Sequence, residues 1–155
     1  MRGGAKLVHS VDSSAKAIDL TCKNVELNFP GDKRHEAFAE DAFKYLDRMG
    51  DQYDLIILDP PAFAKHKNVL HNALQGYRKL NAKAFEKIKP GGILFTFSCS
   101  QVVTKQNFRL AVFSAAAQSK RRVRILHQLT QPADHPVNIY HPEGEYLKGL
   151  VLYVE

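Results

Sequence analysis

The amino-acid sequence predicts an α/β fold with a mainly parallel sheet and an antiparallel hairpin near the C-terminus. Short aliphatic segments alternate with amphipathic helical patterns through residues 6–119, as in consecutive β–α units. Residues 55–58 and 93–97 are largely apolar without polar alternation, which is typical of parallel strands covered on both faces. Residues 123–129 and 147–154 are two further apolar segments joined by a loop that contains three prolines, so we expect them to pair as a hairpin.

The first half of the chain predicts two β–α units. A strand over 6–11 leads into Asp12-Ser13-Ser14, which can cap a helix over about 14–28 whose buried face includes Cys22. A brief strand over 36–39 and a short helix after Asp41 follow.

The second half predicts a strand over 53–58, which ends at Asp59-Pro60-Pro61. A helix over 70–88 follows, because apolar residues recur there at helical spacing for roughly five turns. Pro90-Gly91-Gly92 is expected to break this helix before the strand at 93–97, and another helix is expected over about 104–119.

Composition limits the possible functions. A chain of 155 residues is expected to form one domain. Lys and Arg exceed Asp and Glu by 22 − 16 = +6, which makes a polyanionic partner plausible. No apolar run approaches the ~20 residues of a membrane span and the start lacks a signal peptide's apolar stretch, so we expect a cytosolic protein that does not enter a membrane. The spacing of the cysteines and histidines predicts no metal site.

Four residues follow the predicted parallel strands and are candidates for chemistry: Asp12, Asp41, Asp59 and Cys99. Ligands of open α/β sheets bind beyond the carboxyl ends of the strands. Asp12 could accept hydrogen bonds from a ribose diol, and Asp41 has the same ambiguity, because either residue could instead cap a helix. Cys99 lies just past an apolar strand and shortly before a helix, where a thiolate can be stabilised, although a lone cysteine is more often a small buried hydrophobe.

The segment after residue 58 is a candidate site for a nucleobase. Pro60 and Pro61 make the loop rigid, which suits the holding of a flat base but also simply ends a strand. Phe63 could stack on the base or could anchor the loop. Lys65 and Lys67 in the loop are candidates for phosphate contacts, as are the basic residues 120–124, with a solvated surface as the alternative.

These residues resemble a known family. The segments that carry the resemblance are Asp59-Pro60-Pro61-Ala62-Phe63, Gly76-Tyr77-Arg78, residues 91–100, Ala133-Asp134-His135-Pro136-Val137 and residues 142–149. Together they are similar to the catalytic domain of the bacterial 23S rRNA (cytosine-C5)-methyltransferases, which use S-adenosylmethionine (SAM). The resemblance covers essentially the whole chain and is most specific in its second half.

The resemblance implies a class I methyltransferase, or Rossmann-like, sandwich with SAM as cofactor and 23S rRNA as partner. It places Asp12 with Ser13 at the cofactor ribose, Asp41 with Ala42 near the adenine, and Asp59 to Pro61 in the base-binding and catalytic loop. Cys99 matches the nucleophile, which adds to C6 of cytosine so that C5 can accept the methyl group. Asp59 would protonate or hydrogen-bond N3 of the cytosine and so stabilise the adduct. For this role the pKa of its carboxyl group would need to be raised by burial, so that it can act as an acid near neutral pH.

The front of the sequence departs from the family. A strand and a glycine-rich loop that the family places before Met1 have no counterpart in residues 1–155, so we expect an incomplete catalytic domain whose first, central strand is missing. Two alternatives stay open. One is a methyltransferase that acts on guanine or protein, and the other is a non-catalytic module that binds RNA or forms a homodimer through exposed sheet edges.

Overall fold

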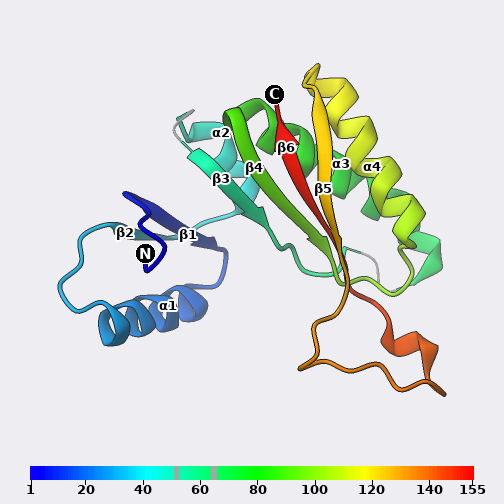
Figure 1. Cartoon of the computed structure of the whole chain (residues 1–155), viewed down its shortest axis with the longest axis horizontal. Helices are drawn as coiled ribbons and strands as arrows, with labels where there is room; N and C mark the ends of the chain where they lie inside the picture. The colour runs from blue at the N-terminus through cyan, green and yellow to red at the C-terminus, as the bar shows by residue number, and fades with distance from the viewer. Residues whose placement is uncertain (51–52, 64–65) are drawn as a thin grey trace. The chain divides into compact units, whose positions relative to one another are not determined.

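The computed structural model describes residues 1–50, 53–63 and 66–155, which divide into two compact units, Met1–Met49 and Gly50–Glu155 (Figure 1). Each unit has its own hydrogen-bonded sheet, of two strands in the first and four in the second. Of the four strand pairings described, two are parallel and two are antiparallel, so the expectation of a mainly parallel sheet is only partly met.

The first unit contains the two predicted β–α units. Strand β1 (Val8–Asp12) pairs in parallel with β2 (His35–Ala39), and helices α1 (Ala15–Asn28) and α2 (Ala42–Arg48) each follow one of these strands. The side chain of Ser14 accepts a hydrogen bond from the backbone N–H of Ala17, 3.3 Å away, and so caps α1.

The prediction that Cys22 is buried is wrong. Cys22 is exposed, and Ile18 is the buried residue of α1 among those that the structure describes. The sheet in this unit has only two strands, so a 14-residue helix has more apolar surface than the sheet can cover.

The second unit contains the four-stranded sheet, in the order β3-β4-β6-β5. Its strands are β3 (Tyr53–Leu58), β4 (Ile88–Ser98), β5 (Val123–Leu129) and β6 (Lys148–Val154). β3 and β4 are parallel, whereas β6 is antiparallel to both β4 and β5. The predicted hairpin is therefore confirmed, with β6 inside the sheet and β5 at its edge.

Two long helices pack together and form much of the core of the second unit (Figure 1). Helix α3 (Leu70–Lys87), which the short 3-10 helix η1 (Lys67–Val69) precedes, and helix α4 (Lys105–Ser119) lie close to the predicted ranges. Tyr77 of α3 and Phe108 of α4 are both buried, and their rings meet edge to face with centroids 5.3 Å apart.

Two details of the sheet differ from the prediction. Residues 90–92 do not separate a helix from a strand, because β4 already begins at Ile88 and passes through an irregular register in which Gly91 has φ +82°. The strand β3 is not covered on both faces, since Leu55 and Ile57 are 50% and 61% exposed. Among the described residues, no helix is both long and apolar enough to span a membrane.

Candidate active site

The second unit brings two of the predicted site residues to one edge of its sheet. Leu58, the last residue of β3, pairs with Thr96 of the parallel strand β4. Asp59 directly follows Leu58, and Cys99 directly follows Ser98, the last residue of β4. Both residues therefore follow the carboxyl ends of parallel strands, as the sequence predicted.

Cys99 lies between two buried neighbours. Ser98 and Ser100 are 0% and 1% exposed, whereas Cys99 is half-buried. The Ser98 hydroxyl donates a hydrogen bond to the Tyr77 hydroxyl over 2.9 Å. Burial raises the pKa of Tyr77, while its hydrogen bonds with Ser98 and with the backbone of Phe63 oppose that shift. The segment that carries Cys99 is therefore attached to α3 through Ser98, and Cys99 itself remains partly accessible.

A buried lysine also binds this segment. Lys148, the first residue of β6, pairs with Ser98 across the sheet and is 6% exposed. Its Nζ donates hydrogen bonds to the backbone oxygens of Ser100 and Tyr146, each over 2.6 Å. Burial lowers the pKa of Lys148, while interaction with Cys99 opposes that shift. The sequence offered one signal for this residue, a lysine at the start of an apolar strand, and we did not assign it a role.

The loop over 130–146 is tied to the residues that follow Cys99. Gln101 Nε2 donates to the backbone oxygen of Glu143 over 3.2 Å, and the ammonium of Lys105 pairs with the carboxylate of Glu145. The hydrogen bond from Lys105 lowers the pKa of Glu145. The loop, orange in Figure 1, leaves the sheet at the same edge as Cys99, because β6 is antiparallel to β4.

The Asp-Pro-Pro segment is only partly as predicted. Asp59 and Pro61 are exposed and Pro60 is half-buried, so the burial that an acid role for Asp59 requires is not present. Phe63 packs on Tyr77 with ring centroids 4.7 Å apart, and a Cβ at position 76 would lie 3.2 Å from the Phe63 ring. Phe63 is thus a loop anchor that Gly76 accommodates. Lys65 and the side chain of Lys67 lie outside the described residues.

The first unit places Asp12 and Asp41 at the carboxyl ends of its two parallel strands. Asp12 pairs with Ala39 at the end of the ladder, and its Oδ1 accepts a hydrogen bond from the N–H of Ser14 over 2.7 Å. Asp41 accepts from the N–H groups of Phe43 and Lys44 over 3.0 and 3.1 Å, so it caps α2. Ser13 is exposed and Ala42 begins α2.

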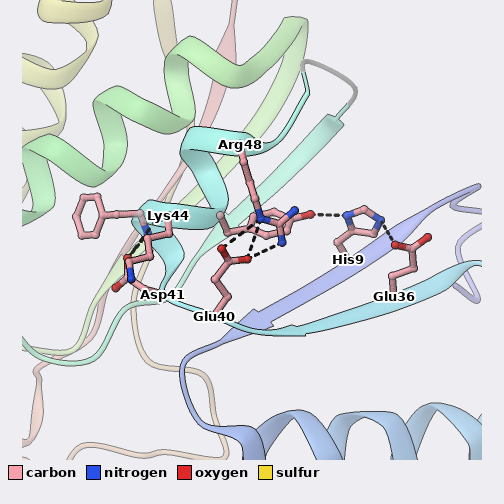
Figure 2. Close-up of polar contacts among 8 residues, drawn as sticks. His9, Glu36, Glu40, Asp41, Lys44 and Arg48 are labelled. Atoms are coloured by element: carbon pink, nitrogen blue, oxygen red, sulfur yellow. Dashed lines mark hydrogen bonds and ion pairs between the residues drawn. The ribbon is translucent and has the colours of Figure 1, made fainter.

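A polar and aromatic cluster, which the sequence pattern did not predict, packs α2 against β1. Figure 2 shows Arg48 of α2 paired with Glu40, and His9 of β1 facing Glu36. His9 also makes a short hydrogen bond to the hydroxyl of Tyr45, and the guanidinium of Arg48 lies 4.7 Å from the centroid of that ring. The hydrogen bond from Arg48 lowers the pKa of Glu40. These contacts hold the helix that Asp41 begins.

The basic residues fall into distinct environments. Arg121, one of the candidate phosphate contacts, donates to the backbone oxygens of Phe85, Ile88 and Glu155 over 2.8, 3.1 and 2.7 Å, so its role is structural. A cavity of about 290 Å³ lies where α4 begins and β5 ends. Among the described residues, its lining contains no carboxylate and three cationic residues, Lys105, Arg109 and Lys148. In the described residues, no group of three or more His, Cys, Asp or Glu side chains could hold a metal ion.

Comparisons with known proteins extend this description. No protein-family model matches the chain. Ribosomal RNA large subunit methyltransferase I of Cronobacter sakazakii is 42% identical over 157 residues, covering 99% of this chain and 40% of the relative. The protein of the same name from Tolumonas auensis is 43% identical over 155 residues, covering 98% and 39%. A crystal structure of a candidate methyltransferase complexed with SAH matches 98% of this chain and 40% of its own, at 25% identity and a TM-score of 0.82.

The chain has a methyltransferase fold. A candidate SAM-dependent methyltransferase from Streptococcus mutans, 23% identical with a TM-score of 0.81 over 98% of this chain, has the same fold. The chain spans about 40% of the length of the curated relatives that it matches.

Proposed function

We propose that this chain is the catalytic part of a SAM-dependent methyltransferase that modifies C5 of a cytosine in 23S rRNA, with Cys99 as its nucleophile. The observation that carries the proposal is the half-buried Cys99, which lies between two buried serines. It follows the carboxyl end of β4, beside the end of the parallel strand β3 that Asp59 follows. The names of the curated relatives, ribosomal RNA large subunit methyltransferases, support rRNA as the substrate.

The proposed role of Cys99 follows from the chemistry of cytosine. C5 is a poor nucleophile, so the Cys99 thiolate forms a bond to C6, and the C5–C6 π electrons become available at C5. SAM, when bound, supplies the methyl group from its sulfonium. After methyl transfer a base takes the proton from C5, and the electrons of that C–H bond re-form the C5–C6 double bond while the C6–S bond breaks. Cys99 then leaves as a thiolate.

The residues present fit the cofactor. The carboxylates of Asp12 and Asp41 lie at strand ends, and a carboxylate that accepts one or two backbone N–H bonds has lone pairs left for ribose or amino groups. Within this proposal, Asp12 and Ser13 hold the ribose and Asp41 and Ala42 contact the adenine. Asp59 and Pro60 of the second unit are further proposed cofactor contacts.

Pro61 is the proposed RNA contact that the structure describes at the same edge as Cys99, and Lys65 and Lys67 are proposed from the sequence. Pro61 is exposed beside Asp59, and Lys65 and Lys67 follow in the loop. The cationic cavity suits a backbone phosphate, because the exposed Arg109 is part of its lining and the lining residues that the structure describes include no carboxylate. Asp59 is exposed in the free protein, so its proton at N3 would depend on coverage by the target base, which must be unstacked to reach the site.

A covalent trap tests the nucleophile. RNA that contains 5-fluorocytosine cannot lose a C5 proton, so we expect a stable protein–RNA adduct with the wild-type chain and SAM, none with Cys99→Ala, and an unchanged yield with Cys22→Ser. A wild-type protein that methylates RNA without an adduct would remove the cytosine-C5 mechanism in favour of a target such as guanine. A chain that binds neither SAM nor RNA would overturn the proposed function.

A second candidate function is self-association. In the described part of the chain, β3 has no ladder partner on one side, and Leu55 and Ile57 on this strand are half or more exposed. Exposed apolar edge strands pair readily with other chains. Light scattering at increasing concentration tests this: the wild-type protein should associate and Leu55→Lys should stay monomeric. A wild-type protein that stays monomeric would argue against self-association.

A further inference from the structure

The most unusual side chain near the candidate nucleophile is a buried ammonium group. Lys148 is 6% exposed, and its Nζ has two partners in the described residues, the backbone oxygens of Ser100 and Tyr146. Both partners are neutral carbonyl groups. Burial of a charge without an opposite charge is costly, so a lysine at this position calls for an explanation beyond packing.

The position of Lys148 relates it to Cys99 in two ways. It pairs with Ser98 across the β4–β6 ladder, and it binds the carbonyl of Ser100, so it holds the residues on both sides of Cys99. The electrostatic interaction between Lys148 and Cys99 raises the pKa of the lysine against the effect of burial, which indicates that the two groups are close enough to interact.

We propose that Lys148 is a positioning residue for Cys99, because its ammonium group fixes the backbone that presents the thiol and brings a positive charge to that segment. This inference rests on the proposed function of Cys99 as the nucleophile. A cation near a cysteine favours the thiolate, which is the reactive form. The hydrogen bonds to Ser100 and Tyr146 at the same time connect the Cys99 segment to the loop over 130–146.

Other charged or titratable groups face this region and must be considered. Lys105 at the start of α4 lowers the pKa of Lys148, and Lys105 is itself paired with Glu145 of the loop. Asp59 after β3 and Cys99 both interact electrostatically with Tyr77 of α3. Of these groups, Lys148 is the one that is both cationic and bonded to the Cys99 segment.

The test is the reaction rate of Cys99 with iodoacetamide in the full chain, measured by mass spectrometry from pH 6 to pH 10 in a Cys22→Ser background. Cys22 is exposed and would otherwise react as well. We expect Lys148→Met to slow the reaction about threefold to tenfold at neutral pH, since the nearby charge is lost. The deficit should shrink as the pH rises, because the thiolate then forms without a cation beside it.

Lys89→Met is the matched control, because Lys89 lies near the opposite end of β4 and pairs with Asp54 over 3.1 Å. It should leave the rate and its pH dependence unchanged. An alkylation rate for Lys148→Met equal to that of the wild type would overturn the proposal. A slowing of the same size at every pH would also overturn it, because it would show only that iodoacetamide reaches Cys99 less easily.

A second pair of variants separates charge from folding. Lys148→Arg keeps the cation and should keep the pH dependence of the reaction near that of wild type, whereas Lys148→Gln keeps hydrogen-bond donors without the charge and should behave as Lys148→Met. Thermal unfolding monitored by circular dichroism shows which variants are folded. An altered alkylation profile without a 5-fluorocytosine adduct would overturn the proposed function alone, and an unaltered profile with an adduct would overturn the role of Lys148 alone.

Discussion

The hydrogen bond between Ser98 and Tyr77 allows a direct measurement of how firmly the Cys99 segment is held. Tyr77→Phe removes only the hydroxyl group and leaves the ring against Phe63 and Phe108. Because Ser98 and Tyr77 are both 0% exposed, water does not replace the lost partner. The variant should therefore lower the free energy of unfolding by about 1–3 kcal/mol, the cost of a buried polar group without a hydrogen bond.

Urea denaturation followed by circular dichroism measures this change, and Ser98→Ala completes a double-mutant cycle. The double variant should be less destabilised than the sum of the single variants by about 1 kcal/mol, because removal of both partners leaves no unsatisfied hydroxyl group. Strict additivity, or a loss below about 0.5 kcal/mol for Tyr77→Phe, would refute the reasoning.

The same residue predicts a pH dependence. The folded-state pKa of Tyr77 is raised above 10.0, mainly by burial, so the folded state retains a proton that the unfolded state loses. The contribution of Tyr77 to stability is thus fully present below pH 10 and is lost as the pH rises above that value. The decline in wild-type stability above pH 10 should be weaker in Tyr77→Phe.

Three further variants or groups give expected outcomes. Gly149→Ala should destabilise the protein by about 1–3 kcal/mol in urea unfolding, because the new Cβ would lie 2.6 Å from Cε1 of Phe97. Arg121→Lys should cost about 1–3 kcal/mol in the same assay, since one ammonium cannot reach the three carbonyl groups that the guanidinium binds. Asp32 should titrate with a pKa of about 2, mainly because of its hydrogen bonds with Arg34, so its contribution to stability is present above pH 3.8 and lost as the pH falls toward 2. NMR titration of the carboxyl carbon measures this value.

Each outcome has a control. Gly3→Ala meets nothing within 4 Å, and Arg122→Lys is a substitution at an exposed position, so both should change stability by less than about 0.5 kcal/mol. Arg34→Ala should return the pKa of the Asp32 carboxyl group toward 3.8. Equal effects of the glycine or arginine variants and their controls would contradict the packing and hydrogen-bond arguments, and titration of wild-type Asp32 near 3.8 would contradict the pairing.

The periodicity of the sequence predicted most of the helices and strands, but it could not predict what covers them. The helix expected over 70–88 is α3 within one residue, and the two apolar segments near the C-terminus form the expected hairpin. The aliphatic run 55–58 correctly indicated a strand, yet Leu55 and Ile57 are exposed. A pattern of apolar residues reports a preference for burial, whereas burial itself depends on which other elements pack there.

The candidate site shows a similar division. The rule that ligands bind at strand ends correctly grouped Asp59 with Cys99, because it depends only on strand order and direction. It could not decide between ribose binding and capping for Asp12 and Asp41, since both roles use the same carboxylate oxygens. Lys148 was not predicted as a candidate residue because a lysine is normally exposed, and only the structure shows that this one is buried.

The net charge of +6 overstates the positive charge that is available to RNA. Arg34 pairs with Asp32 and Arg121 binds carbonyl groups, so their charges serve the fold, and Lys148 is buried. Arg109 is exposed and lines the cationic cavity at the edge that bears Cys99. If Arg109 contacts a phosphate, Arg109→Ala should weaken RNA binding in fluorescence anisotropy and reduce the slope of log K against log salt by about 1. Arg122→Ala is the control for the loss of one exposed arginine, and an equal effect of both variants would show that the cavity has no special role in RNA binding.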